Sequence, residues 1–327
     1  MSDPFDVLSA AERDLLRPAP VPGFVAPMKA VLSDAPFSDP AWIFERKLDG
    51  IRCVAIKSGG EVRLLSRNEL SLNGRYPEVA TALERDPADG LVVDGEVVAF
   101  EGSRTSFGRL ARRGHERVAI FLYAFDLMHL AGHDTRALPL RARKRLLRRA
   151  LAFGGRVRLT AHRNGDGESL YRQACSKGWE GVIAKRGDSS YTSARSRDWL
   201  KLKCSAEQEL VVGGYTAPKG SREELGALLV GYFEDGRLRY AGKVGTGFDR
   251  ATLRDLARLL RPLRRERSPF ADDDVPARGA TWVEPELVVQ VGFSEWTGHG
   301  RLRHPRFLGV RDDKDAREVV RERAAAP

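Results

Sequence analysis

One lysine in this chain is placed to act as a nucleophile. It belongs to the segment Glu45-Arg46-Lys47-Leu48-Asp49-Gly50-Ile51-Arg52. Residues two apart on a β-strand share a face, so Glu45, Lys47 and Asp49 are expected to form one polar face. A lysine amine attacks only after losing its proton, and burial, neighbouring cations or a metal must oppose its usual pKa of about 10.4. Gly50 allows a turn or a close ligand approach and Arg52 adds a cation, which makes Lys47 the candidate nucleophile.

Three carboxylates are placed to bind a cation or a sugar hydroxyl. Asp94 and Glu96 lie on one face of an apolar strand expected over residues 92–98. Carboxylates flanked by valines are costly to bury without cations, and a divalent metal or a ribose hydroxyl would satisfy them. Glu180 stands at the entry of a short buried strand and is the third candidate. Lys185 receives less weight, because its odd distance from Glu180 puts the two side chains on opposite faces of a regular strand.

Two lysines near residue 200 form a candidate phosphate site. In Trp199-Leu200-Lys201-Leu202-Lys203 the lysines share one face of a strand and the leucines share the other. Two parallel ammonium groups repel each other unless they share an anion, and a nucleotide phosphate is the obvious anion. An edge strand that Lys201 and Lys203 protect from aggregation is the alternative interpretation.

Two other side chains are candidates for a nucleotide site. Phe125 lies in an apolar strand, where an aromatic ring belongs to the core more often than to a base-stacking surface. Arg67 lies in the polar turn Ser66-Arg67-Asn68, where an ordinary surface arginine is equally compatible with the pattern. Both residues therefore have a structural alternative to a binding role.

The spacing of strands, prolines and glycines divides the chain into two domains and a tether. Residues 1–23 contain a short helical pattern followed by prolines, which predicts a tether. Residues 24–204 alternate β-rich runs with helical segments, which predicts an α+β domain with largely antiparallel sheets. Residues 205–327 carry five short strands and an inserted helix, which predicts an OB-fold β-barrel. The basic segment 138–153 predicts a solvated amphipathic helix, with a nucleic-acid-facing helix as the alternative.

Composition limits the classes of function. The 327 residues carry a net charge of +10 and the pI is about 9.7, which favours a nucleic-acid partner over an inert basic surface. The cysteines Cys53, Cys175 and Cys204 have no Cys-x-x-Cys spacing, which disfavours a disulfide framework or a four-cysteine zinc site and favours a reducing cytosol. No signal core and no apolar run of ~20 residues is visible, so no membrane association is expected.

From Phe24 to Val320 the chain resembles ATP-dependent DNA ligases, most closely the ligase module of the bacterial end-joining enzymes. The resemblance rests on the order of the segments above along the chain, ending with Arg311-Asp312-Asp313-Lys314. It implies a nucleotidyltransferase (adenylation) domain followed by the OB-fold domain, with Lys47 as the adenylated residue. The other implied roles are adenine or ribose contact for Glu45, Arg52, Glu96 and Phe125, contact with AMP and DNA for Arg67, metal binding for Glu96 and Glu180, phosphate binding for Lys201 and Lys203, and orientation of pyrophosphate for Arg311 and Lys314.

A three-step reaction follows from this resemblance. Lys47 attacks the α-phosphate of ATP to give lysyl-AMP, AMP passes to a 5′-phosphate at a nick, and a 3′-hydroxyl displaces AMP. The implied cofactors are ATP and Mg²⁺ or Mn²⁺, and the implied partners of a monomeric, cytoplasmic, nucleoid-associated enzyme are nicked double-stranded DNA and end-joining or repair proteins. An RNA ligase or capping guanylyltransferase shares the lysine chemistry and is the nearest alternative. A catalytically silent OB-fold DNA-binding module is the alternative outside enzymes.

Overall fold

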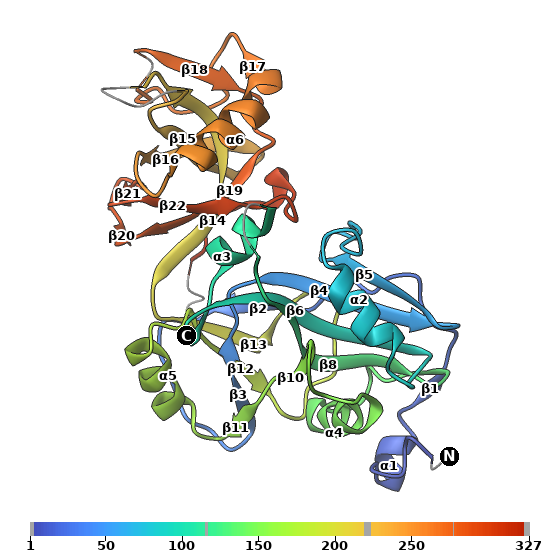
Figure 1. The fold of residues 1–327 in the computed structure, drawn as a ribbon. Helices are drawn as coiled ribbons and strands as arrows, with labels where there is room; N and C mark the ends of the chain where they lie inside the picture. Colours follow the sequence, from blue (N-terminus) through green and yellow to red (C-terminus); the bar gives the residue numbers. More distant parts are fainter. Residues whose placement is uncertain (1–2, 115–116, 219–223, 277, 324–327) are drawn as a thin grey trace. The chain divides into compact units, whose positions relative to one another are not determined.

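The computed structural model describes residues 3–114, 117–218, 224–276 and 278–323. These residues form two compact units, one ending at Cys204 and the other running from Ser205 to Arg323. The first unit is an α+β domain with two mainly antiparallel sheets (Figure 1). The second is an OB-type barrel, so the fold class predicted from the sequence is confirmed.

The larger sheet of the first unit is built around three long antiparallel strands. These are β4 (Ile51–Ser58), β6 (Leu91–Glu101) and β8 (Ile120–Leu130). Alternate residues of these strands face opposite sides, which gives each strand one face for helices and one for the second sheet. The shorter strands extend the sheet at its margins: β5 (Glu61–Ser66), β7 (Arg104–Thr105), β9 (His133–Asp134), β1 (Arg17–Pro18) and β10 (Val157–Leu159), the last in parallel with β8.

The smaller sheet of the first unit carries the candidate nucleophile. Its central strands are β3 (Trp42–Lys47), β12 (Gly181–Arg186) and β13 (Arg195–Lys203), which pair antiparallel in that order. Two short strands close its edges, β11 (His162–Asn164) beside β3 and β2 (Lys29–Leu32) in parallel with β13.

Helices cover the outer face of each sheet. The helices α2 (Pro77–Glu84) and α4 (Leu140–Ala150) pack on the larger sheet, where they share one hydrophobic core with alternate residues of β4 such as Cys53. The helix α5 (Gly167–Ser176) packs on the smaller sheet against Phe44. Each helix therefore buries one side of a sheet and leaves the other side for contact between the sheets.

The inner faces of the two sheets meet in a third core. Val54 of β4 and Phe125 of β8 belong to the same buried cluster as Trp199 of β13. The odd-numbered residues of β3 lie on this inner side, because the even-numbered Phe44 packs on α5. The alternation predicted around Lys47 is therefore observed up to the end of β3.

The second unit is organised around one long strand, β14 (Ala206–Thr216), which pairs with three others. Its helix α6 (Arg250–Leu260) is the inserted helix that the sequence predicts for this unit, and it ends in a single 3₁₀ turn. The remaining elements of the barrel are β15 (Leu228–Glu234), β16 (Arg237–Val244), β17 (Arg264–Arg265), β18 (Ala280–Val283), β19 (Val288–Phe293) and β22 (Arg306–Val310), with the hairpin β20 (Glu295–Trp296) and β21 (Leu302–Arg303).

The N-terminal segment differs from the predicted tether. Phe5 and Leu8 are buried in the core that α2 and α4 share with the larger sheet. The short helix α1 (Ala10–Arg13) follows, and Arg17 and Pro18 form β1 on the edge of the sheet. The physical reason is that two apolar side chains gain more from burial than a solvated tether would allow.

One disulfide is present, although the cysteine spacing disfavoured a disulfide framework. Cys175 of α5 and Cys204 form a disulfide, with their Cα atoms 5.1 Å apart, while Cys53 is a buried free thiol. The two residues are 29 positions apart, and only the packing of α5 on the smaller sheet brings them within bonding range.

No helix in the described part of the chain is both long and apolar enough to span a lipid bilayer.

Candidate active site

Strand register brings four of the predicted site residues onto one face of the smaller sheet. Gly181 of β12 is the register partner of both Lys47 on β3 and Lys203 on β13. Two residues further along β12, the flanking positions are Glu45 on β3 and Lys201 on β13. Cross-strand partners point to the same side of a sheet, so these four charged side chains lie on the inner face.

Lys47 is bound by a carboxylate from the adjacent loop. Its Nζ donates a hydrogen bond to Oε1 of Glu180, and the lysine and glutamate side chains are 19% and 8% exposed. Burial lowers the pKa of Lys47, but the charges of Glu180, Glu96 and Asp49 outweigh it and hold that pKa well above its usual value. The amine is therefore protonated at neutral pH, and it becomes nucleophilic only when the Glu180 charge is drawn away or neutralised.

The position of Glu180 depends on the glycine that follows it. Gly181 has φ +151°, and a Cβ there would lie 2.0 Å from the carbonyl oxygen of Leu202. No side chain fits that space, so glycine allows the start of β12 to lie close to β13. The preceding residue, Glu180, then lies within hydrogen-bonding distance of Lys47. The second carboxylate oxygen of Glu180, Oε2, is buried and has no hydrogen-bond partner among the described residues.

Asp49 leaves the polar face that the sequence predicted for it. β3 ends at Lys47, and Asp49 lies in the following turn, where its Oδ2 accepts a hydrogen bond from the backbone of Phe107. Its own backbone N–H donates to Thr105 Oγ1 at 3.0 Å. Asp49 thus fixes the turn after the nucleophile, and its charge contributes to the raised pKa of Lys47.

Arg52 and Asp94 form a bidentate pair on the inner face of the larger sheet. Arg52 donates from Nε and Nη2 to the two oxygens of Asp94, both at 2.5 Å, and Asp94 is fully buried. The hydroxyl of Tyr191 also donates to Asp94 at 2.7 Å. Burial lowers the pKa of Arg52, but Asp94 outweighs it and raises that pKa. Protein groups therefore satisfy Asp94, whereas the sequence suggested a metal or a ribose for it.

Glu96 and Arg67 lie near this pair by strand register. Glu96 is the register partner of Arg52, and its charge contributes to the raised pKa of Lys47. Strand β5 ends at Ser66, the partner of Cys53, so Arg67 follows at the level of Arg52. The turn after β5 is closed by Ser66, whose Oγ accepts from the backbone of Leu70 at 3.1 Å.

Lys185 belongs to the site, although the sequence gave it little weight. Its Nζ lies 2.8 Å from Oε2 of Glu45, 4.1 Å from the centre of the Phe125 ring and 3.9 Å from that of Trp199. The parity argument failed because Glu180 precedes the strand, so the alternation of β12 starts at Gly181 and puts Lys185 on the inner face. A count from Gly181 would have found it.

Glu45 is held between two lysines. Lys144 of α4 donates to its Oε1, and Lys185 lies at its Oε2. Burial raises the pKa of Glu45, but the two ammonium groups outweigh burial and hold that pKa below its usual value. The sequence did not predict Lys144 as a site residue, because a helix of Lys and Arg indicates solvent exposure rather than a buried ion pair.

The predicted residues of the second unit form ion pairs within that unit. Arg311 is buried and bonds to both oxygens of Asp313, at 2.8 and 2.9 Å. Burial raises the pKa of Asp313, but Arg311 outweighs burial and lowers it. Lys314 Nζ lies 2.9 Å from Oε1 of Glu209 on β14.

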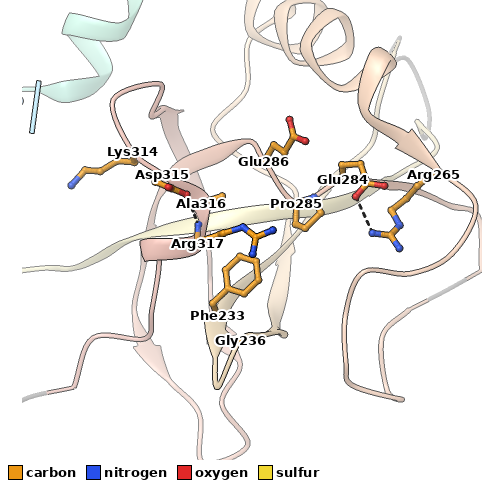
Figure 2. Close-up of a pocket in the computed structure, with 10 residues that line it drawn as sticks. All are labelled: Phe233, Gly236, Arg265, Glu284, Pro285, Glu286, Lys314, Asp315, Ala316 and Arg317. Carbon is orange, nitrogen blue, oxygen red and sulfur yellow. Dashed lines mark hydrogen bonds and ion pairs between the residues drawn. The ribbon is translucent and has the colours of Figure 1, made fainter. Parts of the chain in front are cut away.

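A pocket of about 520 Å³ lies beside Lys314. Figure 2 shows Lys314 at one edge of this pocket and the ion pair between Arg265 and Glu284 on the opposite side. Arg311 does not line it. Among the described site residues that the sequence predicted, only Lys314 lines this pocket.

A divalent cation fits the donors of the first unit only with help from a ligand. The described residues contain no group of three or more His, Cys, Asp or Glu side chains that could hold a metal. Glu180 offers a buried carboxylate oxygen without a partner, and Glu96 is the second candidate donor. Mg²⁺ is commonly held by one or two carboxylates together with substrate phosphates and waters, and that donor set is compatible with this site.

Comparison with known families gives two matches that cover most of the chain. The model described as "ATP dependent DNA ligase domain" matches residues 27–203. The model described as "ATP dependent DNA ligase C terminal region" matches residues 221–314. The two matches fall on the first and the second compact unit, respectively.

Curated relatives include two proteins named for end joining. The chain is 41% identical over 321 residues to the multifunctional non-homologous end joining protein LigD of Pseudomonas aeruginosa, a match that covers 94% of this chain and 38% of the relative. It is 41% identical over 290 residues to the LigD repair protein of Mycobacterium tuberculosis, covering 86% and 37%. The chain thus spans about two fifths of the length of these relatives.

Solved structures include ligase domains of similar length. A mycobacterial DNA ligase D, described as complexed with ATP and MES, matches with a TM-score of 0.66 and 36% identity, covering 91% of this chain and 98% of the other. The ligase domain of LigD from M. tuberculosis matches with a TM-score of 0.50 and 37% identity, with the same coverage.

Proposed function

The chain belongs to the ATP-dependent DNA ligase family, and on that premise we propose that it seals nicks in double-stranded DNA through an adenylate carried on Lys47. The observation that carries the proposal is the arrangement around one amine. Lys47 is paired with Glu180 and shares a sheet face with Glu45, Lys201 and Lys203. A nucleophile, a releasable counter-ion and phosphate-binding cations are the groups that nucleotidyl transfer needs.

In the first step Lys47 would attack the α-phosphorus of ATP. A phosphorus–nitrogen bond forms, the bond from the α-phosphorus to the bridging oxygen breaks, and pyrophosphate leaves. The ammonium must first lose a proton, and any change that draws the Glu180 carboxylate away from Nζ lowers the pKa of the amine. A divalent cation, Mg²⁺ or Mn²⁺, held by Glu180 and Glu96, would supply positive charge at the phosphates.

In the next two steps AMP would move from protein to DNA and then leave. A 5′-phosphate oxygen attacks the lysyl-AMP phosphorus and releases the Lys47 amine, and a 3′-hydroxyl then displaces AMP as the phosphodiester forms. Both transition states gather negative charge, so Lys201 and Lys203 act by neutralisation rather than by proton transfer. Arg311 and Lys314, on the OB-fold domain, are proposed to orient pyrophosphate in the first step.

The base and the ribose would bind between the two sheets. Phe125 is proposed to stack on adenine, with Glu45 beside the base. Arg52 and Glu96, which are register partners, are proposed to face the ribose, and Arg67 to contact AMP and DNA. The bidentate pair with Asp94 keeps the Arg52 guanidinium in one orientation, which supports a positioning role for it.

The proposed cellular role rests on the names of the curated relatives. Two relatives are named for non-homologous end joining, so we propose that this chain works in end joining at the nucleoid, as a monomeric ligase with other repair proteins. In this proposal residues 24–204 are the adenylation domain and residues 205–327 the OB-fold domain.

Incubation with α-labelled ATP and Mg²⁺ or Mn²⁺ tests the proposal. The wild type should take up label on Lys47 and lose it to nicked DNA, whereas Lys47→Ala should take up none. Lys243→Ala, at an exposed lysine of the second unit, is the matched control and should label normally. Label from GTP alone, or transfer only to nicked RNA, would support a capping enzyme or an RNA ligase instead.

A further inference from the structure

Helix α4 buries two of its cations. Arg143 is fully buried and Lys144 is 6% exposed, whereas Arg145, Arg148 and Arg149 on the same helix are exposed. The sequence predicted a solvated helix, and this expectation was wrong for the two buried residues. Burial of a cation is unfavourable without an anion and hydrogen bonds, so each buried side chain must have a specific partner.

Structural contacts account for Arg143 completely. Its Nε and Nη2 donate to the two oxygens of Asp126 at 2.7 and 3.0 Å. Its Nη1 donates to the carbonyl oxygens of Leu138 and Ser189, at 2.5 and 2.9 Å. The pair is neutral and joins α4 to β8.

Lys144 differs because it shares its anion. It bonds to one oxygen of Glu45 while Lys185 lies at the other, so one carboxylate serves two buried ammonium groups. Since Arg143 and Asp126 cancel each other, these five side chains together carry one positive charge in excess. A buried excess charge of this kind is stabilised by a ligand that accepts hydrogen bonds or presents π-electrons.

The excess charge lies against aromatic rings. The ammonium of Lys185 is about 4 Å from the ring centres of both Phe125 and Trp199, a distance typical of a cation–π contact. Glu45 anchors Lys185 there with one oxygen, and Lys144 fixes the other oxygen. The place of Lys185 at the rings therefore depends on a helix that lies outside the series of motifs.

We propose that Lys144 is a positioning residue for the nucleotide base: it fixes the carboxylate of Glu45 and, through it, holds Lys185 at the rings of Phe125 and Trp199. This inference rests on the proposed function, because it takes the base of ATP as the ligand. Lys144 touches none of the reacting atoms in that mechanism. Its loss should therefore weaken nucleotide binding and base selection much more than the bond-making step.

The protonation of Lys185 gives a second consequence. The pKa of Lys185 is lowered to about 8, because burial and the charge of Lys144 together outweigh Glu45 and Asp126, which act to raise it. The groups that face Lys185 are thus Glu45 from β3, Lys144 from α4 and Asp126 from β8. Since the Lys185 ammonium is proposed to help bind the base, ATP affinity should fall as the pH rises through the pKa of Lys185. Removal of Lys144 raises that pKa, so this alkaline fall in ATP affinity should move to higher pH. A general loss of packing would not shift this alkaline limb of the pH dependence of ATP affinity.

The test compares Lys144→Met, Lys144→Arg and the exposed control Arg148→Met in the full chain. ATP affinity is measured by calorimetry, and KM and kcat are measured for self-adenylation with ATP and with GTP. Lys144→Met should weaken ATP affinity and raise KM about tenfold, narrow the preference for ATP over GTP, and change kcat by less than about threefold. Lys144→Arg should restore most of the affinity, and Arg148→Met should match the wild type.

Unchanged ATP affinity and an unchanged ATP:GTP ratio in Lys144→Met would overturn the inference, as would a loss confined to kcat. If Lys144→Met does not fold, Lys144→Gln retains one donor for Glu45 and should show the same upward shift of the alkaline limb. Calorimetry separates this inference from the proposed function. ATP binding without label on Lys47 would contradict the function alone, and Lys144→Met binding ATP like the wild type would contradict the positioning role alone.

Discussion

Glu180, the residue before β12, accepts a hydrogen bond from the ammonium of Lys47 at the end of the neighbouring strand β3. The residue proposed as nucleophile is therefore held in its unreactive, protonated form by the residue proposed as metal ligand. Since a carboxylate cannot fully neutralise both a lysine and a metal ion, these two roles of Glu180 compete, and the competition is a natural switch for the amine.

Glu180→Gln should separate the two effects. Loss of the charge lowers the pKa of Lys47, so modification of Lys47 by an amine-reactive acetylating reagent at pH 7 should accelerate about tenfold for each pKa unit. Self-adenylation should nevertheless fall at least about a hundredfold, because the metal donor is lost. Peptide mass spectrometry measures the first rate, and Glu61→Gln, an exposed site on β5, is the control. Slower acetylation of Lys47 in Glu180→Gln would contradict this account of the pair.

Arg52→Met should destabilise the first unit through its partner. Of the donors to Asp94 in the described part of the chain, Tyr191 would remain, and Asp94 would be a buried charge without a cation, which costs about 3 kcal/mol. Urea unfolding measures the change, with the exposed Arg63→Met on β5 as control. A loss below about 1 kcal/mol would show that Asp94 is solvated or protonated without Arg52.

Because of Lys185, the free energy of unfolding should increase with pH above about pH 8. Its folded pKa is about 8 and its ordinary value is 10.5. Between these values the unfolded chain binds the proton that the folded chain has released, so the free energy of unfolding increases with pH by at most about 3 kcal/mol from this group. Lys185→Met should lack that increase between pH 8 and pH 10 in urea titrations, whereas the exposed Lys243→Met should retain it. The same slope in Lys185→Met and wild type would assign the increase to other groups.

Gly181→Ala should misplace Glu180. The new Cβ meets the Leu202 carbonyl at 2.0 Å in a backbone conformation that other residues rarely adopt, so β12 must move away from β13. We expect a loss of about 2 kcal/mol or more in stability and a larger loss of self-adenylation than of ATP affinity. Gly74→Ala, where a Cβ meets nothing within 4 Å, is the control. Full self-adenylation by Gly181→Ala would mean that the position of Glu180 does not depend on the close approach of β12 to β13 at Gly181.

Arg311→Ala tests the proposed role of the second unit in the first step. We propose that the OB-fold domain contacts ATP during self-adenylation and binds DNA afterwards. The substitution should therefore lower self-adenylation at least about tenfold more than sealing of pre-adenylated nicked DNA. The exposed Arg237→Ala is the control, and thermal unfolding checks the loss of the pair with Asp313. Equal losses in both assays would contradict the proposal that Arg311 acts mainly in self-adenylation.

Local sequence patterns were enough to predict which residues share a face within a strand. The two-residue period around Lys47 and in Lys201-Leu202-Lys203 predicted polar faces, and the structure shows them, because side chains alternate in any strand that packs one face on a helix. The glycine-punctuated strands after residue 205 predicted the barrel for the same local reason.

Which charges meet depends on how the strands and helices pack, and the sequence patterns did not predict it. The pairing of Lys47 with Glu180, of Arg52 with Asp94 and of Lys144 with Glu45 joins residues 42 to 133 positions apart. The burial of Phe5 and the bond between Cys175 and Cys204 depend equally on how helices and edges pack. Local periodicity describes one strand or helix at a time, whereas strand order and helix docking arise from burial across the whole unit, and these select the partner of every buried charge.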